Sequence, residues 1–381
     1  MQIGVDNFCG RRMTQAMDYR MVSKGSLAEQ LQVSPSTITK YLNGDARPKP
    51  ENFVRIYQIL GFPPTFFTTP LVAESDDRKL WRSFASAKKV ARMRGEVALD
   101  WQVEVHEYFN SVFTLPKFNL GEFQVKATDH KSITYDQIEN IALQIREHWG
   151  VGTRPLTKLL WHMECSGIVV NAVNLMVEKL DAVSAITKEV PHVLLNSFEH
   201  ASARSRFDAA HELGHIILHS KVSKDDLKKE GFSELEDQAH YFASSLLLPA
   251  ESFLRDLWAP TMKCFIEMKP KWITSLQAMM RRALDLNAIT HSQYSYLNIH
   301  ISKKHWRKAE PLDDILKVER PRLFAQCLER LENDKGISPK ETLEALRMPE
   351  DVAEQFFAVR QGYFDDSQDD ESGNVLSFRK N

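Results

Sequence analysis

The sequence predicts a mainly α-helical protein with a small antiparallel β-sheet, an α+β fold divided into more than one domain. Apolar residues recur at the spacing of amphipathic helices in many segments. β-Branched runs gather in one stretch and predict the strands, namely SGIVVNAV (166–173), DAVSAIT (181–187) and PHVLLNS (191–197). The length of 381 residues allows two or three domains.

The overall charge limits the kind of partner that the whole chain can bind. The net charge is −2, so any contact with DNA must come from a locally basic surface. The first residues, MQIGVDNFCGRR, lack the apolar core of an export signal, and no apolar run approaches the roughly 20 residues that span a bilayer. We therefore expect a cytoplasmic protein without a membrane partner. The widely spaced cysteines form no CxxC pair and are expected to be free thiols, at Cys9, Cys165, Cys264 and Cys327.

The first segment, residues 1–70, contains two short helices joined by a tight turn. Ser23 can cap the first helix, whose inward-facing residues are Leu27, Ala28 and Leu31. Ser34 or Pro35 begins the second helix, whose inward-facing residues are Ile38, Tyr41 and Leu42. Asn43 and Gly44 end it. This pattern predicts a helix-turn-helix.

The outward face of the second helix has the chemistry of a DNA reader. Short hydroxyls and one cation can bond base edges and phosphates, and they are Ser36, Thr37, Thr39 and Lys40. Residues 1–60 hold eight Lys or Arg against five Asp or Glu, so positive charge is concentrated here. A small helical bundle for protein contact is the alternative. Residues 8–67 resemble the lambda-repressor/Cro-like (XRE) helix-turn-helix family, which implies operator DNA as a partner and a homodimer on paired half-sites.

Prolines in GFPPTFFTTP end this segment, and a helical connector is expected over residues 71–130. The connector includes a basic stretch over 78–94 that we expect to be helical. A second domain follows over 131–310. Residues 311–381 are expected to form a helical C-terminal region with a disordered acidic tail, DDSQDDESGNVLSFRKN.

The stretch RFDAAHELGHIILH (206–219) carries the strongest chemical signal. His211 and His215 lie four residues apart, so both imidazoles share one helix face and can bind a single metal ion. Glu212 is turned about 100° away, beside the metal, where its carboxylate can deprotonate a bound water. Zinc prefers such ligands. The alternative is a buried helix with hydrogen-bonded histidines, although burying these groups without partners is costly. Gly214 inside the helix indicates close approach by another group.

A third ligand is expected from the next helix, LEDQAHYFASSLLL (235–248). Glu236 shares a face with small residues that allow close packing, so it is the preferred ligand. Asp237 and His240 are the alternatives. His219 follows His215 by one turn and is either a ligand, a contact behind the ligands, or a packed hydrogen-bonded histidine.

The two motifs together resemble the ImmA/IrrE family of zinc metallopeptidases, here with a fused N-terminal Cro-like domain. The family combines HExxH with a downstream ExxA(N)xFA…LL-P segment. The resemblance implies a zincin-like domain in which Zn²⁺ is bound by His211, His215 and Glu236, with Glu212 as the catalytic base. The family usually has Asn where this chain has His240, which leaves the role of that position open.

The resemblance also implies a function. It indicates a cytoplasmic DNA-binding regulator with zinc endopeptidase activity that cleaves a partner repressor or an antitoxin. Two other functions stay open: a transcriptional regulator whose metal site is structural or sensory, and a metallopeptidase toxin of a toxin–antitoxin or phage-defence pair. The strand at 191–197 is either a sheet edge that an extended substrate joins or a purely structural strand.

Overall fold

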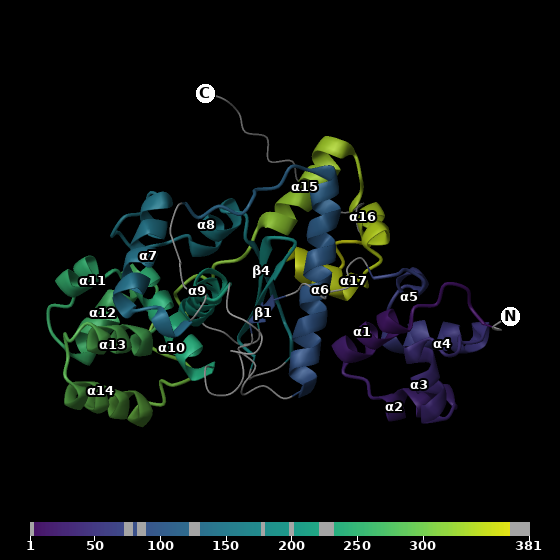
Figure 1. Cartoon of the computed structure of the whole chain (residues 1–381), viewed down its shortest axis with the longest axis horizontal. Helices are drawn as coiled ribbons and strands as arrows, with labels where there is room; N and C mark the ends of the chain where they lie inside the picture. The colour runs from purple at the N-terminus through teal and green to yellow at the C-terminus, as the bar shows by residue number, and fades with distance from the viewer. Residues whose placement is uncertain are drawn as a thin grey trace. The chain divides into compact units, whose positions relative to one another are not determined.

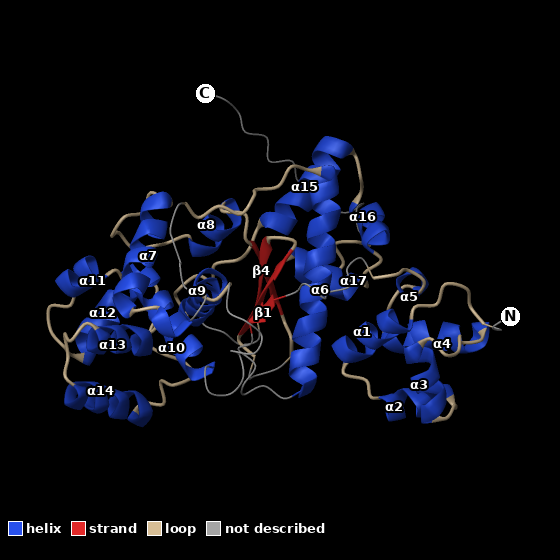
Figure 2. Cartoon of the chain, viewed as in Figure 1, coloured by secondary structure: helices blue, strands red, loops and turns tan. Residues whose placement is uncertain are grey.

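The computed structural model describes residues 4–71, 79–81, 89–121, 130–176, 180–197, 202–220 and 232–365. The chain divides into two compact units (Figure 1). One unit combines residues 1–71 with 324–381, and the other comprises residues 72–323. Helices dominate the described residues, and the strands form one small group (Figure 2). The predicted fold class, mainly α with a small sheet, is confirmed.

The N-terminal part of the first unit is a bundle of short helices: α1 (Gly10–Arg20), α2 (Lys24–Leu31), α3 (Pro35–Asn43), α4 (Pro50–Leu60) and α5 (Pro64–Phe67). The hydroxyl of Ser23 accepts a hydrogen bond from the backbone N–H of Ser26 at 3.1 Å and so caps α2. Ser34 caps α3 in the same way through the N–H of Thr37, at 3.3 Å. Gly44 ends α3 with φ of 79°, a left-handed conformation that glycine adopts without strain. These local signals form the helix-turn-helix as predicted.

The same unit contains the last helices of the chain: α15 (Leu323–Lys335), α16 (Pro339–Leu346) and α17 (Glu350–Phe357). Arg20 of α1 donates two hydrogen bonds to the carboxylate of Asp351 in α17, at 2.6 and 2.8 Å. The expected domain boundaries at 70, 130 and 310 stay predictions. The acidic tail after residue 365 lies outside the described residues.

The second unit consists of helices around the sheet. Its helical elements are α6 (Lys89–Val112), the 3-10 helix η2 (His130–Ser132), α7 (Tyr135–His148), α8 (Leu159–Cys165), α9 (Ser202–Leu218), α10 (Phe232–Leu247), α11 (Ala250–Asp256), α12 (Met262–Trp272), α13 (Leu276–Asp285) and α14 (His291–Lys303). Its strands are β1 (Lys79–Trp81), β2 (Val169–Val173), β3 (Ala182–Thr187) and β4 (Val190–Asn196). Their order across the sheet is β1-β3-β4-β2.

The sheet is mixed rather than purely antiparallel. β3 and β4 form an antiparallel hairpin around Lys188 and Glu189, but β4 pairs with β2 in parallel. The expectation of an antiparallel sheet is wrong for this pair, because β4 lies between β3 and β2 and runs in the same direction as β2. β4 is thus paired on both sides, so of the two alternatives for residues 191–197 the substrate edge is wrong, and the structural strand is the one that remains.

The connector expected to be helical over 71–130 contains a strand. Residues Lys79–Trp81 form β1 and pair antiparallel with β3. Pairing with β3 overrides the helical pattern of this stretch. Residues 82–88 lie outside the described part, and the helix α6 follows from Lys89.

Helices α6 and α9 lie on opposite sides of the sheet and bury it on both faces (Figure 1). Gln102 of α6 donates hydrogen bonds to the carbonyl oxygens of Val169 and Val193, at 2.8 and 3.2 Å. These bonds join α6 to both β2 and β4. The four cysteines are free, as predicted. Among the described residues, no helix combines the length and the apolar character needed to cross a membrane.

Candidate metal centre

Helices α9 and α10 pack unusually closely, and Gly214 makes this possible. A Cβ atom added to Gly214 would lie 3.1 Å from Cδ1 of Phe242 and 3.2 Å from Cα of Ala239, both in α10. The small side chain of Ala239 completes the contact. The sequence-based expectation of a close approach at Gly214 is confirmed, and the approaching group is the backbone of the neighbouring helix. The site residues of the two helices are thereby brought within reach of each other.

Three of the predicted residues converge between these helices. Nε2 of His211 lies 3.0 Å from Nε2 of His215. The carboxylate of Glu236 lies 3.3 Å from the first of these nitrogens and 3.2 Å from the second. A tetrahedral zinc ion with bonds of about 2.0–2.1 Å would hold neighbouring ligand atoms roughly 3.3–3.4 Å apart. Two imidazoles and a carboxylate at this spacing fit a zinc ion in both geometry and chemistry.

The charges within this triangle stabilise one another. Burial disfavours the charged form of His211, but the hydrogen bond to Glu236 and the nearby carboxylates outweigh burial and raise the pKa of His211. Burial alone would raise the pKa of Glu236, whereas its two histidine partners lower it. The interactions with His211 and His215 prevail and hold the pKa of Glu236 well below its usual range. The carboxylate is therefore ionised at neutral pH and available to a cation.

Glu212 lies next to the triangle rather than within it. Its side chain is fully buried, and one carboxylate oxygen, Oε2, accepts a short hydrogen bond from the hydroxyl of Ser184 in β3. Ser184 is itself fully buried in the strand that packs against α9. The sheet thus fixes the orientation of the carboxylate expected to act as base. Sequence reasoning missed Ser184, because a serine within a buried strand carries no local signal of this role.

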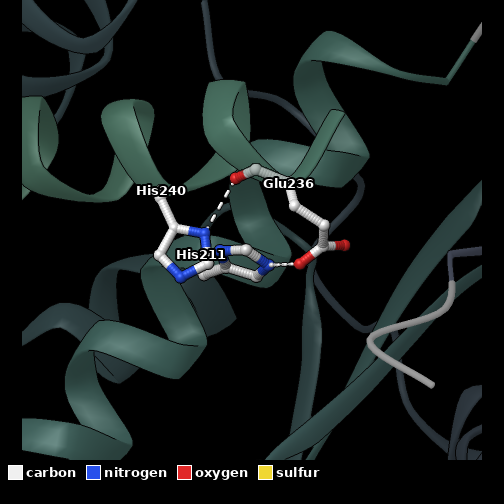
Figure 3. Close-up of side chains that lie close together, drawn as sticks. All are labelled: His211, Glu236 and His240. Carbon is white, nitrogen blue, oxygen red and sulfur yellow. Dashed lines mark hydrogen bonds and ion pairs between the residues drawn. The ribbon is translucent and has the colours of Figure 1, made fainter. Parts of the chain in front are cut away.

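His240 extends the cluster on the side of α10. Its ring centroid lies 4.4 Å from that of His211, and its Nδ1 donates a hydrogen bond to the backbone oxygen of Glu236 at 2.8 Å (Figure 3). Burial and the charge of His211 lower the pKa of His240, which favours a neutral ring. His211, Glu236 and His240 each offer a ligand atom within 4.8 Å of the others. His240 therefore lies where it could offer a further ligand atom or a polar contact to a metal ion in the triangle.

The other candidates occupy different surroundings. Asp237 is exposed and lines a neighbouring cavity instead of joining the triangle. His219 is fully buried and lies behind His215, with 3.0 Å between their Nδ1 atoms. Its Nε2 lies 2.9 Å from Oε1 of Gln238, a residue that sequence reasoning also missed. His219 thus lies behind His215 and does not face the triangle.

A cavity of about 960 Å³ opens beside the cluster. His240 and Asp237 lie in its wall, together with Phe207, Asp208 and Tyr241. Burial, followed by the charge of Asp181, raises the pKa of Asp208 to about 8. The cavity is large enough to admit several residues of an extended peptide next to the metal centre.

The candidate DNA-reading residues lie on α3, in the other unit. Ser36 and Lys40 are exposed, whereas Thr37 and Thr39 are half-buried. The hydroxyls of Ser36 and Thr37 lie 2.7 and 2.9 Å from that of Ser34, the helix cap. The hydroxyl of Thr39 donates to the backbone oxygen of Pro35 at 3.2 Å. Lys40 therefore offers the longest outward reach of the four.

Comparisons with known families agree with this division of the chain. A peptidase-family model described as "IrrE N-terminal-like domain" matches residues 163–283, and a model described as "Helix-turn-helix" matches residues 19–67. Both predicted resemblances are confirmed over these residues, in the predicted order along the chain. The first match includes all of α9 and α10 and indicates a metallopeptidase domain. The second indicates DNA binding. The comparison with curated proteins finds no match.

Proposed function

We propose that this chain is a cytoplasmic, DNA-binding regulator that hydrolyses a peptide bond in a partner protein, a repressor or an antitoxin, with the help of a zinc ion. The observation that carries the proposal is the convergence of His211, His215 and Glu236 at 3.0–3.3 Å between two closely packed helices. The match to a peptidase family over the same helices supports it. The helix-turn-helix supports action on DNA, as a homodimer on paired half-sites.

The residues around the triangle have distinct tasks in this proposal. His211, His215 and Glu236 would hold the zinc ion, which when bound would supply Lewis acidity and lower the pKa of a nearby water molecule. Glu212 accepts a proton from the attacking water and later delivers it to the leaving amine. Ser184 keeps the carboxylate of Glu212 in a fixed orientation through its hydrogen bond. The cavity bordered by His240 receives the substrate chain next to these groups.

Metal content and cleavage test this proposal together. Wild-type protein should bind about one zinc ion per chain, and His211→Ala should lose it. Glu212→Gln should keep zinc and DNA binding but lose cleavage of a candidate repressor or antitoxin by about 10²–10⁴-fold. Absence of zinc in the wild-type protein, even after zinc is supplied, would contradict the proposal.

A second function is favoured by the full burial of Glu212 and its bond to Ser184. In this reading the metal site senses zinc or stabilises the fold, and DNA binding is the output. Glu212→Gln separates the two functions. Unchanged regulation of a target promoter by Glu212→Gln, with zinc still bound, would support the sensor and exclude the peptidase.

A further inference from the structure

A chain of buried hydrogen bonds runs away from the metal centre on the far side of His215. Nδ1 of His215 lies 3.0 Å from Nδ1 of His219, and Nε2 of His219 lies 2.9 Å from Oε1 of Gln238. The amide nitrogen of Gln238 donates to the backbone oxygen of Ile133 at 3.4 Å. The residues His215, His219 and Gln238 are 2%, 0% and 3% exposed. Bulk water therefore has little access to these contacts.

When both imidazoles are neutral, ordinary hydrogen-bond chemistry assigns the protons along this chain. Because the amide nitrogen of Gln238 faces the carbonyl of Ile133, its amide oxygen faces His219. An amide oxygen only accepts, so Nε2 of His219 carries the hydrogen. A neutral imidazole then has its lone pair on the other nitrogen, Nδ1. That lone pair accepts a hydrogen from Nδ1 of His215, which leaves the lone pair of His215 on Nε2.

The lone pair on Nε2 of His215 points toward the other residues of the triangle. Nε2 of His215 is the atom that faces His211 and Glu236, at 3.0 and 3.2 Å. We propose that His219 and Gln238 are positioning residues that fix His215 as the Nδ1–H tautomer, with Nε2 ready to bind zinc before the ion arrives. The proposal rests on the zinc site of the proposed function. Hydrogen bonds behind metal-binding histidines commonly set their tautomer and orientation in this way.

The two histidine ligands differ in this respect. Nδ1 of His211 is buried and has no hydrogen-bond partner among the described residues. His215 is thus the proposed ligand whose tautomer is fixed by hydrogen bonds. Removing those hydrogen bonds should weaken zinc binding without removing any ligand.

The tautomer can be measured in the wild-type protein without metal. Nitrogen-15 NMR of histidine-labelled, zinc-free full-length protein should show a protonated Nδ1 and an unprotonated Nε2 for His215. The His215 signals are assigned by their absence from the spectrum of His215→Gln. A protonated Nε2 at His215 would overturn the proposal. This result does not depend on zinc binding, so it is distinct from a failure of the proposed function.

A matched pair of variants at position 219 tests the consequence. His219→Asn places an acceptor oxygen close to the position of Nδ1, whereas His219→Leu has similar bulk and no acceptor. We expect His219→Leu to lower zinc affinity by about 10–100-fold and His219→Asn to retain most of it. Affinity is measured by competition with a chelator. Wild-type affinity in His219→Leu, or an equal loss in both variants, would overturn the proposal.

Position 238 provides an independent test if His219→Leu fails to fold, as judged by circular dichroism. Gln238→Glu keeps an acceptor for Nε2 of His219, and Gln238→Met removes it at similar length. Gln238→Met should weaken zinc binding more than Gln238→Glu, and the His215 tautomer should become mixed only in Gln238→Met. Equal zinc affinities and identical tautomers in the two variants would contradict the role assigned to Gln238.

Discussion

Helix α3 turns Ser36 and Lys40 outward to solvent, whereas helix α9 buries His211, Glu212 and His215. The outward hydroxyls of α3 bond within their own helix and to its cap. Those of α9 depend on α10 and on the sheet for their contacts. A surface that reads a partner can be built from one helix and its cap. A metal centre needs residues that are distant in sequence to be placed to within a few tenths of an ångström.

The largest effect should come from removing the ligand that α10 contributes. Glu236→Ala should lower zinc affinity by more than the about 10–100-fold that is typical of supporting residues, because it removes one of three ligand side chains. Asp237→Ala, one position along the same helix, should bind zinc as the wild type does, since Asp237 faces the cavity. Chelator competition measures both. A large loss in Asp237→Ala would point to a different ligand set.

Replacing one helical glycine in each unit by alanine compares how closely the two helices are packed. Gly214→Ala should destabilise the protein by about 1–2 kcal/mol, because the added Cβ meets the backbone of α10. Gly25→Ala in α2 should stabilise its helix by about 0.5–1 kcal/mol, since the nearest atom to its added Cβ is the Ser23 hydroxyl at 3.9 Å. Denaturant unfolding measures both changes. Opposite signs are expected, and equal signs would argue against the close helix contact.

The response of the zinc-free protein to pH should depend on the His211–Glu236 pair. The pKa of Glu236 is lowered from 4.5, so its contribution to stability is present above that value and lost as pH falls further. The pKa of His211 is raised from 6.5, so its contribution is complete below that value and lost as pH rises through the raised pKa. Stabilisation by the pair is therefore greatest between pH 4.5 and pH 6.5.

Thermal unfolding of the zinc-free protein on both sides of this window checks that expectation. Glu236→Gln should flatten the decline in unfolding temperature above pH 6.5, because it removes the charge that raises the His211 pKa. Zinc-loaded protein serves as the control, since a bound ion replaces the proton in the triangle. Identical pH profiles for wild type and Glu236→Gln would contradict the coupling.

The smallest effect should arise at the exposed helix. Lys40→Ala should weaken DNA binding to all sequences similarly and reduce the salt dependence of log affinity by about 1, as loss of one phosphate contact does. Lys335→Ala in α15 removes the same charge away from α3 and serves as the matched control. Fluorescence anisotropy over a salt series measures both variants. An unchanged slope in Lys40→Ala would remove α3 from the DNA contact.

The parts of the molecule that could be predicted are those with local causes. Ser23 and Ser34 cap the helices that they precede, and the spacing of His211 and His215 places both on one face. Glu236 could be chosen because small residues share its face. These features need only the geometry of a single helix.

Other features depend on contacts between distant segments. Ser184 reaches Glu212 only because β3 packs against α9, and Gln238 reaches His219 only because α10 crosses α9 at Gly214. The position of β4 between β3 and β2 likewise depends on its pairing with β2, which is distant in the sequence. A strand at residues 79–81 was unpredictable for the same reason, since its hydrogen bonds are to residues 184–186.

The ion pair between Arg20 and Asp351 has a consequence for how the protein is made. These residues are 331 positions apart, yet both lie in the unit that holds the helix-turn-helix. On the ribosome, α1 to α5 emerge early and can form from local contacts. α17 emerges only after the entire 72–323 unit has been synthesised. The unit that holds the helix-turn-helix therefore becomes complete last, so a nascent chain can bring His211, His215 and Glu236 together before that unit is assembled.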